Sequence, residues 1–261
     1  MLLKIDDITV AYDKHKVLEN FSLDIDEGEI VCLVGESGSG KTTVIRSVLG
    51  LLPTSGHIIS GDIIYNGQSL LSMNQKEFMS VQGTQMSMIF QDSGSMLNPV
   101  RKIGSQFIEY IRVHRKISKK EAENIALERL KEVHLADAEN VMNSYPFQLS
   151  GGMRQRVGIA MALAFEPKLL LADEPTSALD VTIQAQIVRQ MMELQKKENT
   201  AVIMVTHNLG VATYMSNKIV VMQNGRIVES GTREEIMYNP KEEYTKKLIE
   251  AIPTMEGEPY V

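Results

Sequence analysis

The sequence of 261 residues contains a single cysteine, Cys32. One cysteine excludes a disulfide framework within the chain and argues against a cysteine-ligated metal cluster. Because Cys32 lies in the apolar run Ile30–Val34, we expect it to be a small core residue. The length is sufficient to bury a full core, as one α/β domain or as one domain with an inserted lobe.

Basic residues are outnumbered by acidic ones, and long apolar runs are missing from the sequence. The chain has 27 Lys and Arg against 33 Asp and Glu, a formal net charge of −6. Duplex-binding proteins usually present a basic face, so no nucleic-acid partner is expected. The best candidates for a membrane span, the apolar runs Ile30–Val34 and Leu169–Ala172, are far too short to cross a bilayer. The acidic Asp6 and Asp7 do not fit a signal peptide. Any membrane role is therefore expected to come through partner proteins.

One run fills every fixed position of the G-x-x-x-x-G-K-[ST] phosphate-binding loop. Its residues are Gly35, Glu36, Ser37, Gly38, Ser39, Gly40, Lys41 and Thr42. The preceding run Glu29–Val34 predicts a buried strand, and Lys41–Leu49 predicts a helix that stops at Gly50. Such a loop turns backbone N–H groups inward at the positive end of a helix. We expect Lys41 to reach the β- and γ-phosphates of a nucleoside triphosphate and Thr42 to bind Mg²⁺.

The pattern along the rest of the chain predicts an α/β domain with a helical insertion. The predicted strands are Leu2–Ile5, Ile8–Ala11, Phe21–Ile25, Ile58–Tyr65, Lys168–Asp173, Ala201–Thr206, Ile219–Met222 and Ile227–Glu229. The pairs Asn66-Gly67 and Asn224-Gly225 predict tight turns. Between about 98 and 145 the pattern is helical, with a capping box formed by Ser118 and Glu121. The helix predicted at Val181–Lys197 lies between two apolar strands, which implies a parallel pair.

Two carboxylates, Asp173 and Glu174, follow the predicted strand at Leu169–Ala172. Ligands of open α/β sheets bind at the carboxyl ends of the strands. Asp173 suits a role in holding Mg²⁺, and Glu174 suits a general base that orients the attacking water. The alternative is an acidic pair that ends a strand before Pro175. The phosphate-binding loop in the same chain favours the functional interpretation.

A second helix start that contains glycines, here called glycine-marked, is predicted in the segment Leu149–Arg156. Ser150 is placed as the N-cap, and Gly151 and Gly152 permit a close backbone approach to an anion. The helical stretch is predicted to continue from Val157 to Phe165. The phosphate-binding loop at Gly35–Thr42 is already expected to hold the phosphates of one nucleotide. A second phosphate-binding helix N-terminus would therefore be explained if it binds a nucleotide held by another subunit.

With Leu149–Met153 as the signature, residues 2 to 250 resemble the ATP-binding subunits of ABC transporters. The resemblance implies a P-loop NTPase of ABC type, with a RecA-like mixed sheet, an N-terminal antiparallel β subdomain and an α-helical lobe inserted at about 92–150. A short tail, 251–261, would follow. Further matches are Tyr12 for adenine stacking, Thr43 for nucleotide binding, Gln91 as the Q-loop and a Mg²⁺ ligand, Ser177-Ala178-Leu179-Asp180 as the D-loop, and His207 as the switch histidine.

Each of these single residues has a simpler interpretation when taken alone. Tyr12 fits a half-exposed strand aromatic, Gln91 an ordinary loop amide and His207 a strand-end histidine. Their order and spacing around two strong motifs favour the functional roles. The resemblance then implies catalysis by Glu174, His207 and Lys41.

The resemblance also implies an assembly. Two ATPase domains would face head to tail, with ATP between Lys41 of one and Ser150–Gly152 of the other. Gln91 would signal to the helical lobe whether nucleotide is bound. The helical lobe would in turn dock a coupling helix of the membrane subunit. Two integral-membrane permease subunits and an extracytoplasmic substrate-binding protein would complete the complex. The chain would then lie peripherally at the cytoplasmic face of the membrane.

Within the family, the sequence is similar to importers of the dipeptide, oligopeptide and nickel group. The stretches that carry this similarity are Met88–Asp92, Leu97–Pro99, Ser150–Val157, Ala160–Leu163, Asn239-Pro240 and Tyr244–Lys246. Met153, where many ABC proteins have Gln, resembles the first of two different ATPase subunits, so a heterodimer is expected. The alternatives are a soluble ABC ATPase outside transport and the ATPase subunit of an exporter. A P-loop kinase or GTPase would leave Leu149–Met153 unexplained.

Overall fold

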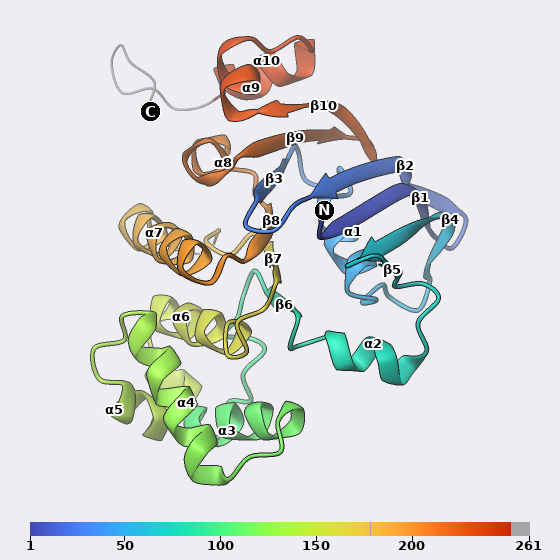
Figure 1. Ribbon diagram of the computed structural model, residues 1–261. Coiled ribbons are helices and arrows are strands. Elements are labelled where there is room, and N and C mark those ends of the chain that lie inside the picture. Colours follow the sequence, from blue (N-terminus) through green and yellow to red (C-terminus); the bar gives the residue numbers. More distant parts are fainter. Residues whose placement is uncertain (178, 252–261) are drawn as a thin grey trace. The chain divides into compact units, whose positions relative to one another are not determined.

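The computed structural model describes residues 1–177 and 179–251 (Figure 1). Ala178 of the expected D-loop and residues 252–261 of the expected tail lie outside the described residues. The chain divides into two compact units. The first contains Met1–Phe78 and the described part of Asn199–Val261, and the second contains Met79–Glu198.

The first unit contains an antiparallel sheet in the strand order β2-β1-β4-β5. The strands are β1 (Leu3–Tyr12), β2 (His15–Ile25), β4 (Gly56–Tyr65) and β5 (Gln68–Ser69). Tyr65 pairs with Gln68 across Asn66 and Gly67, whose φ angles are 48° and 77°. Positive φ at both central residues is typical of a type I′ turn. The predicted tight turn at Asn66-Gly67 is therefore confirmed.

The expectation of two separate strands at Leu2–Ile5 and Ile8–Ala11 is wrong, because β1 is continuous. Its pairing register shifts between Ile5 and Ile8, where Asp7 has a φ of 52°. In a regular strand, residues three apart point to opposite faces. The irregularity lets Ile5 and Ile8 both be fully buried, at 0% exposure. One strand with a bulge thus replaces two short strands.

The first unit also contains a mixed sheet segment in the order β10-β9-β3-β8. Its strands are β3 (Ile30–Val34), β8 (Ala201–Val205), β9 (Lys218–Gln223) and β10 (Arg226–Thr232). β3 runs parallel to β8 and β9, and β9 and β10 form an antiparallel pair around Asn224 and Gly225. Every residue of β3 is buried, and burial raises the pKa of the Cys32 thiol to about 12. Cys32 is therefore the core residue that the sequence predicts.

The helices of the first unit are short, and the end of the first one is set by a local stop signal. They are α1 (Lys41–Val48), α8 (Leu209–Met215), α9 (Arg233–Tyr238) and α10 (Glu243–Glu250), and α2 (Gln75–Val81) spans the unit boundary. After α1, the Gly50 N–H donates to Ser47 O at 3.2 Å and the Leu51 N–H donates to Arg46 O at 2.8 Å. With a φ of 61° at Gly50, this is a Schellman motif. Gly50 ends the helix as predicted.

The second unit combines two parallel strands with a group of helices. The elements are β6 (Met86–Ile89), α3 (Ile103–His114), α4 (Lys119–Glu132), α5 (Ala138–Asn143), the 3₁₀ turn η1 (Pro146–Gln148), α6 (Gly151–Ala162), β7 (Leu169–Asp173) and α7 (Val181–Glu198). α4 packs against α3, α5 and α6, and these helices lie close together in Figure 1. The predicted capping box at Ser118 is confirmed. α6 ends at Ala162 rather than Phe165, because the chain tightens when the Ala164 N–H donates to Met161 O.

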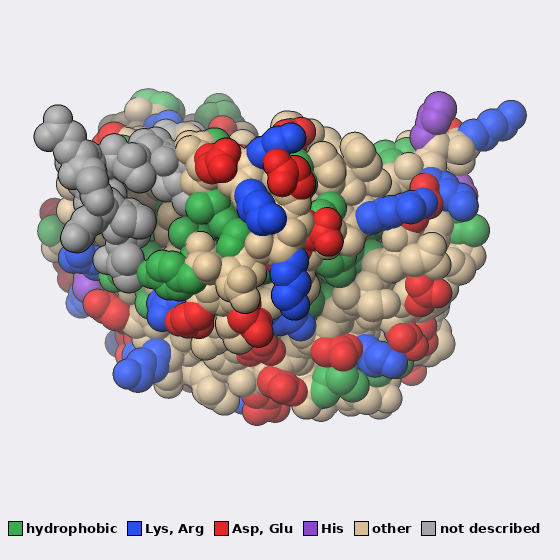
Figure 2. Space-filling model, turned by 90° about the horizontal axis from the view of Figure 1, so that it is seen from above, with side chains coloured by type: hydrophobic (Ala, Val, Ile, Leu, Met, Phe, Trp, Pro, Cys, Tyr) green, Lys and Arg blue, Asp and Glu red, His purple; other side chains and the backbone are tan. Residues whose placement is uncertain are grey.

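Among the described residues, no helix is both long and apolar enough to span a bilayer. Figure 2 looks down on the face that carries α9 and α10, and it shows acidic and basic side chains interspersed there. That face is therefore not a continuous basic surface of the kind that duplex binding requires.

A buried arginine joins three segments of the second unit. The Arg129 guanidinium of α4 donates to Glu132 at 2.7 Å, to Glu198 at 2.6 Å and also to Glu166. Burial raises the pKa of the Glu198 carboxyl, while the charge of Arg129 opposes that shift. The Glu198 side chain is only 6% exposed, so its charge depends on Arg129. This network ties α4 to the end of α7 and to the loop before β7.

We predict that Arg129→Met will destabilise the protein by about 3 kcal/mol, because it leaves a buried carboxylate unpaired. Denaturant unfolding of the purified protein measures the change. Arg101→Met is the matched control, since the pair of Arg101 and Glu109 is exposed and should contribute less than about 1 kcal/mol. Equal stability of the two variants would contradict the assignment of Arg129 as the link between these segments.

Candidate functional site

The phosphate-binding loop of the first unit closes around the side chain of Lys41. The loop joins β3 to α1, and the Lys41 ammonium donates to Gly35 O at 2.8 Å, Glu36 O at 2.7 Å and Ser39 Oγ at 3.2 Å. Lys41 is only 5% exposed. Its charge is thus desolvated and stabilised by oxygen atoms of the loop, which is the setting from which an ammonium binds phosphate strongly.

Two glycines of this loop are required by both backbone conformation and space. Gly35 has a φ of 145°, and an added Cβ would lie 2.1 Å from the carbonyl oxygen of Met222. Gly40 has a φ of 98°, and its Cβ would lie 2.7 Å from Leu18. By contrast, a Cβ on Gly38 would meet no described atom within 4 Å. The loop is therefore packed at both ends and open at Gly38.

Tyr12 and His207 also belong to the first unit. The Tyr12 hydroxyl is hydrogen-bonded to Thr43 Oγ1 at 3.0 Å, which joins the end of β1 to the first turn of α1. His207 is exposed and follows β8. Leu33 of β3 pairs in parallel with Val205 of β8. The phosphate-binding loop and His207 therefore start from the same edge of the sheet.

The second unit brings together Gln91, Glu174 and Ser177. Gln91 Nε2 donates to Glu174 Oε2 at 3.3 Å and to Ser177 Oγ at 3.2 Å. β6 and β7 are parallel, with Ile89 paired to Ala172, so both segments leave one sheet edge. Glu174 has a φ of 44°, a strained conformation for a residue before proline. Asp173, next to it, is 8% exposed.

The second glycine-marked helix start lies at the beginning of α6. Ser150 is the N-cap, and its Oγ accepts the Met153 N–H at 3.2 Å. A Cβ on Gly152 would lie 3.0 Å from Ile183 of α7, whose own N–H donates to Asp180 Oδ1 at 3.0 Å. The sequence predicts Ser150 as the N-cap, and this local feature is confirmed.

Gln155 is a residue whose importance the sequence reasoning missed. It is 5% exposed, its Oε1 accepts the Ser93 N–H at 3.2 Å, and its Nε2 donates to Phe90 O at 3.3 Å and Pro175 O at 2.7 Å. One side chain of α6 thus fixes the segments on either side of Gln91 and the residue after Glu174. A glutamine in a helix gives no local signal of such distant partners.

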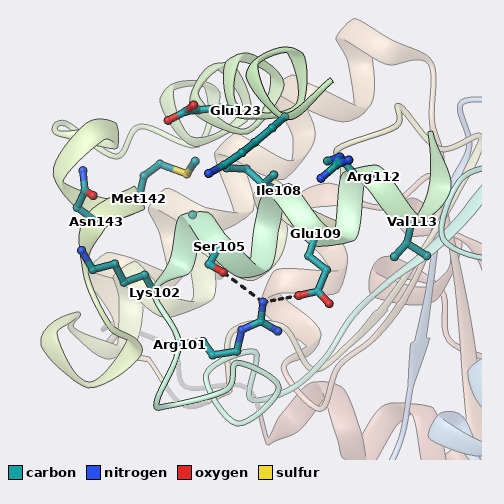
Figure 3. A pocket seen from close by; sticks show the side chains of 12 residues that line it. Arg101, Lys102, Ser105, Ile108, Glu109, Arg112, Val113, Glu123, Met142 and Asn143 are labelled. Carbon is teal, nitrogen blue, oxygen red and sulfur yellow. Dashed lines mark hydrogen bonds and ion pairs between the residues drawn. The ribbon is translucent and has the colours of Figure 1, made fainter. Parts of the chain in front are cut away.

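A pocket of about 650 Å³ lies among α3, α4 and α5 (Figure 3). The Arg101 guanidinium donates to Ser105 Oγ at 3.2 Å and pairs with Glu109, as the dashed lines show. Basic side chains outnumber acidic ones in its lining: Arg101, Lys102, Arg112 and Lys119 against Glu109 and Glu123. Ile108, Val113 and Met142 add apolar surface. The pocket is therefore suited to an amphipathic, partly acidic partner segment.

Comparisons with known proteins agree with this architecture. Residues 18–177 match the family model described as ABC transporter. The oligopeptide transport ATP-binding protein OppD of Bacillus subtilis is 44% identical over 261 residues, which cover 98% of this chain and 73% of OppD. The dipeptide transport ATP-binding protein DppD of Lactococcus lactis is 45% identical over 243 residues, covering 93% of this chain and 70% of DppD.

Two solved structures give the same result at the level of the fold. The dimeric ATP-binding cassette MJ0796, in a post-hydrolysis state bound to ADP and Pi, has a TM-score of 0.79 at 28% identity, covering 89% of this chain and 99% of that chain. CbiO1 of Clostridium perfringens has a TM-score of 0.78 at 25% identity, covering 91% of each. The fold and the loop define a P-loop ATPase of ABC type. The chain belongs to the ABC transporter family, as an ATP-hydrolysing subunit.

We predict that Gly35→Ala will weaken ATP binding by at least about tenfold, or roughly 1.4 kcal/mol. The added methyl group meets a backbone oxygen and forces the loop away from Lys41. Titration with a fluorescent ATP analogue measures the affinity. Gly67→Ala is the control, because Gly67 also has a positive φ of 77° but open space around it. Unchanged affinity in a folded Gly35→Ala variant would contradict the prediction.

Proposed function

We propose that this chain powers an ABC importer of peptides by binding and hydrolysing ATP together with a second ATPase subunit. The observation that carries the proposal is the presence of two glycine-marked helix starts in one chain. One is the start of α1, which follows the phosphate-binding loop around Lys41. The other is the start of α6, which follows its N-cap Ser150. Both are suited to phosphate, and the names of the relatives support a role in peptide transport.

ATP would bind with its phosphates along the exposed part of the loop at Ser37 and Gly38, and with adenine against Tyr12. Mg²⁺ would be held by Thr42, Gln91 and Asp173. These side chains fit the ion because hydroxyl, amide and carboxylate oxygens are the hard ligands that it prefers. When bound, Mg²⁺ would neutralise negative charge on the phosphates.

Hydrolysis would depend on Glu174 as the general base that orients the attacking water. Gln91 donates a hydrogen bond to one carboxylate oxygen of Glu174, so the Q-loop and the base are directly linked. Lys41 would stabilise the negative charge of the β- and γ-phosphates, and His207 would steady the γ-phosphate.

We predict that Glu174→Gln will retain ATP binding but lower ATP turnover by about 100-fold or more, because the amide cannot accept the proton. Steady-state phosphate release and ATP titration of the purified complex separate the two effects. Glu128→Gln, an exposed change on α4, serves as the control and should leave turnover unchanged. Near-normal turnover of Glu174→Gln would exclude Glu174 as the base.

The second ATPase subunit would complete the nucleotide site. Ser150, Gly151 and Gly152 of one subunit would bind the γ-phosphate of ATP held by the other, and Asp180 would lie in the contact between them. The dimeric state of MJ0796 supports such pairing. Met153 supports a heterodimer in which this chain is the first of two different ATPase subunits.

The membrane partners would be two integral-membrane permease subunits, which receive substrate from an extracytoplasmic binding protein. We propose that a segment of one permease docks in the pocket of Figure 3 and holds the chain peripherally at the cytoplasmic face of the membrane. The names of the relatives favour peptides over nickel or metal chelates as cargo. They also favour a transport ATPase over an ATPase outside transport, and the stretches similar to the importer group favour an importer over an exporter.

We predict that Val113→Asp will reduce co-purification of the chain with integral-membrane proteins by about tenfold, the effect of losing about 1.4 kcal/mol of docking free energy, while leaving its ATP affinity unchanged. Val113 is 75% exposed at the pocket edge, so the change opposes docking of an apolar and acidic segment without disturbing the core. Ile59→Asp, at a 52% exposed position on β4, is the control. Absence of any integral-membrane partner of the unaltered chain would favour the ATPase outside transport.

A further inference from the structure

The sequence of Tyr244–Lys246 resembles the peptide-importer group, but the proposed reaction assigns it no role. The structure places it at the start of α10, in the same unit as the phosphate-binding loop. The hydroxyl oxygen of Tyr244 accepts the backbone N–H of Glu36 at 3.1 Å, across 208 positions of sequence. Glu36 is the second residue of the loop. This contact joins the C-terminal helix directly to the phosphate-binding loop.

The start of α10 is itself fixed to the sheet. Glu229 of β10 accepts the Lys241 N–H at 2.8 Å through Oε1 and the Glu242 N–H at 3.2 Å through Oε2. Thr245, next to Tyr244, is fully buried at 0% exposure. β10 pairs with β9, and β9 pairs with β3, the strand from which the loop leaves. Tyr244 is thus presented from a helix anchored on the same sheet as the loop.

The backbone of Glu36 is held from two sides. Its N–H donates to Tyr244, and its carbonyl oxygen accepts the Lys41 ammonium at 2.7 Å. A phosphate group competes with this carbonyl for the ammonium, because a charged acceptor binds it more strongly. The contact from Tyr244 involves neither the Lys41 ammonium nor a phosphate. It can therefore keep the beginning of the loop in place while Lys41 changes partner.

We infer that Tyr244 is a positioning residue that presets the phosphate-binding loop for ATP through the Glu36 amide. The inference rests on the proposed role of Gly35–Thr42 in holding the phosphates. A loop held in its bound conformation loses less conformational freedom on binding, which strengthens affinity. One neutral hydrogen bond of this kind corresponds to a change of about two- to tenfold in the dissociation constant.

Tyr244→Phe tests the inference in the full chain, because it removes the hydroxyl group and keeps the ring. The expected result is an ATP dissociation constant and a KM for ATP raised about two- to tenfold, with kcat unchanged at saturating ATP. Hydrogen exchange measured by mass spectrometry should become faster at the Glu36 amide. Tyr238→Phe is the matched control, since Tyr238 lies on the neighbouring α9 and is 66% exposed.

Unchanged exchange at Glu36 and unchanged affinity in Tyr244→Phe would overturn the inference and leave the proposed ATPase function intact. Faster exchange throughout α10 and β10, without a specific change at Glu36, would also overturn it, because the ring would then serve only packing. If the unaltered protein failed to bind ATP at all, the proposed function itself would be wrong.

Discussion

The buried ammonium of Lys41 is the interaction on which the phosphate-binding loop depends. A charge at 5% exposure is costly unless it is surrounded by acceptors, and the loop supplies them from Gly35, Glu36 and Ser39. To do so the backbone must curl tightly after β3, which requires the positive φ of Gly35 and its close approach to the Met222 carbonyl. Neutral carbonyl groups are weaker partners for an ammonium than phosphate oxygens. The contacts that stabilise the loop are thus also those that a triphosphate can replace.

In the second unit, a single amide has the corresponding role. Gln155 donates to or accepts from the backbone of Phe90, Ser93 and Pro175, so α6 cannot move against these segments without losing a buried hydrogen bond. A Cβ on Gly158, one turn further along α6, would lie 2.3 Å from Ser93 Cβ, which shows how closely the helix and this loop pack. Because Gln91 and Glu174 lie in the segments that Gln155 holds, α6 is mechanically linked to Gln91 and to the proposed base.

The sequence predicts features whose causes are local and misses those whose causes are distant. The Asn-Gly turns, the capping box at Ser118, the end of α1 at Gly50 and the buried strand before the loop are all set by residues within a few positions. The family resemblance identifies the ABC fold because its motifs are short and fixed in spacing. The bulge at Asp7, the partners of Gln155 and the bond between Tyr244 and Glu36 depend on segments up to 208 positions apart. No periodicity or propensity encodes such contacts, since they are decided by tertiary packing.

The two glycines of the second motif, Gly151 and Gly152, differ in whether packing within the chain explains them. Gly152 has a neighbour, because an added Cβ would lie 3.0 Å from Ile183. At Gly151 an added Cβ would meet only Arg154, at 4.0 Å, and the backbone there does not need a positive φ. Among the described residues, nothing therefore explains why Gly151 lacks a side chain. Within a helix, glycine is also less stabilising than alanine. A close approach by a group from outside the chain would explain Gly151, and a phosphate held by a second subunit is such a group.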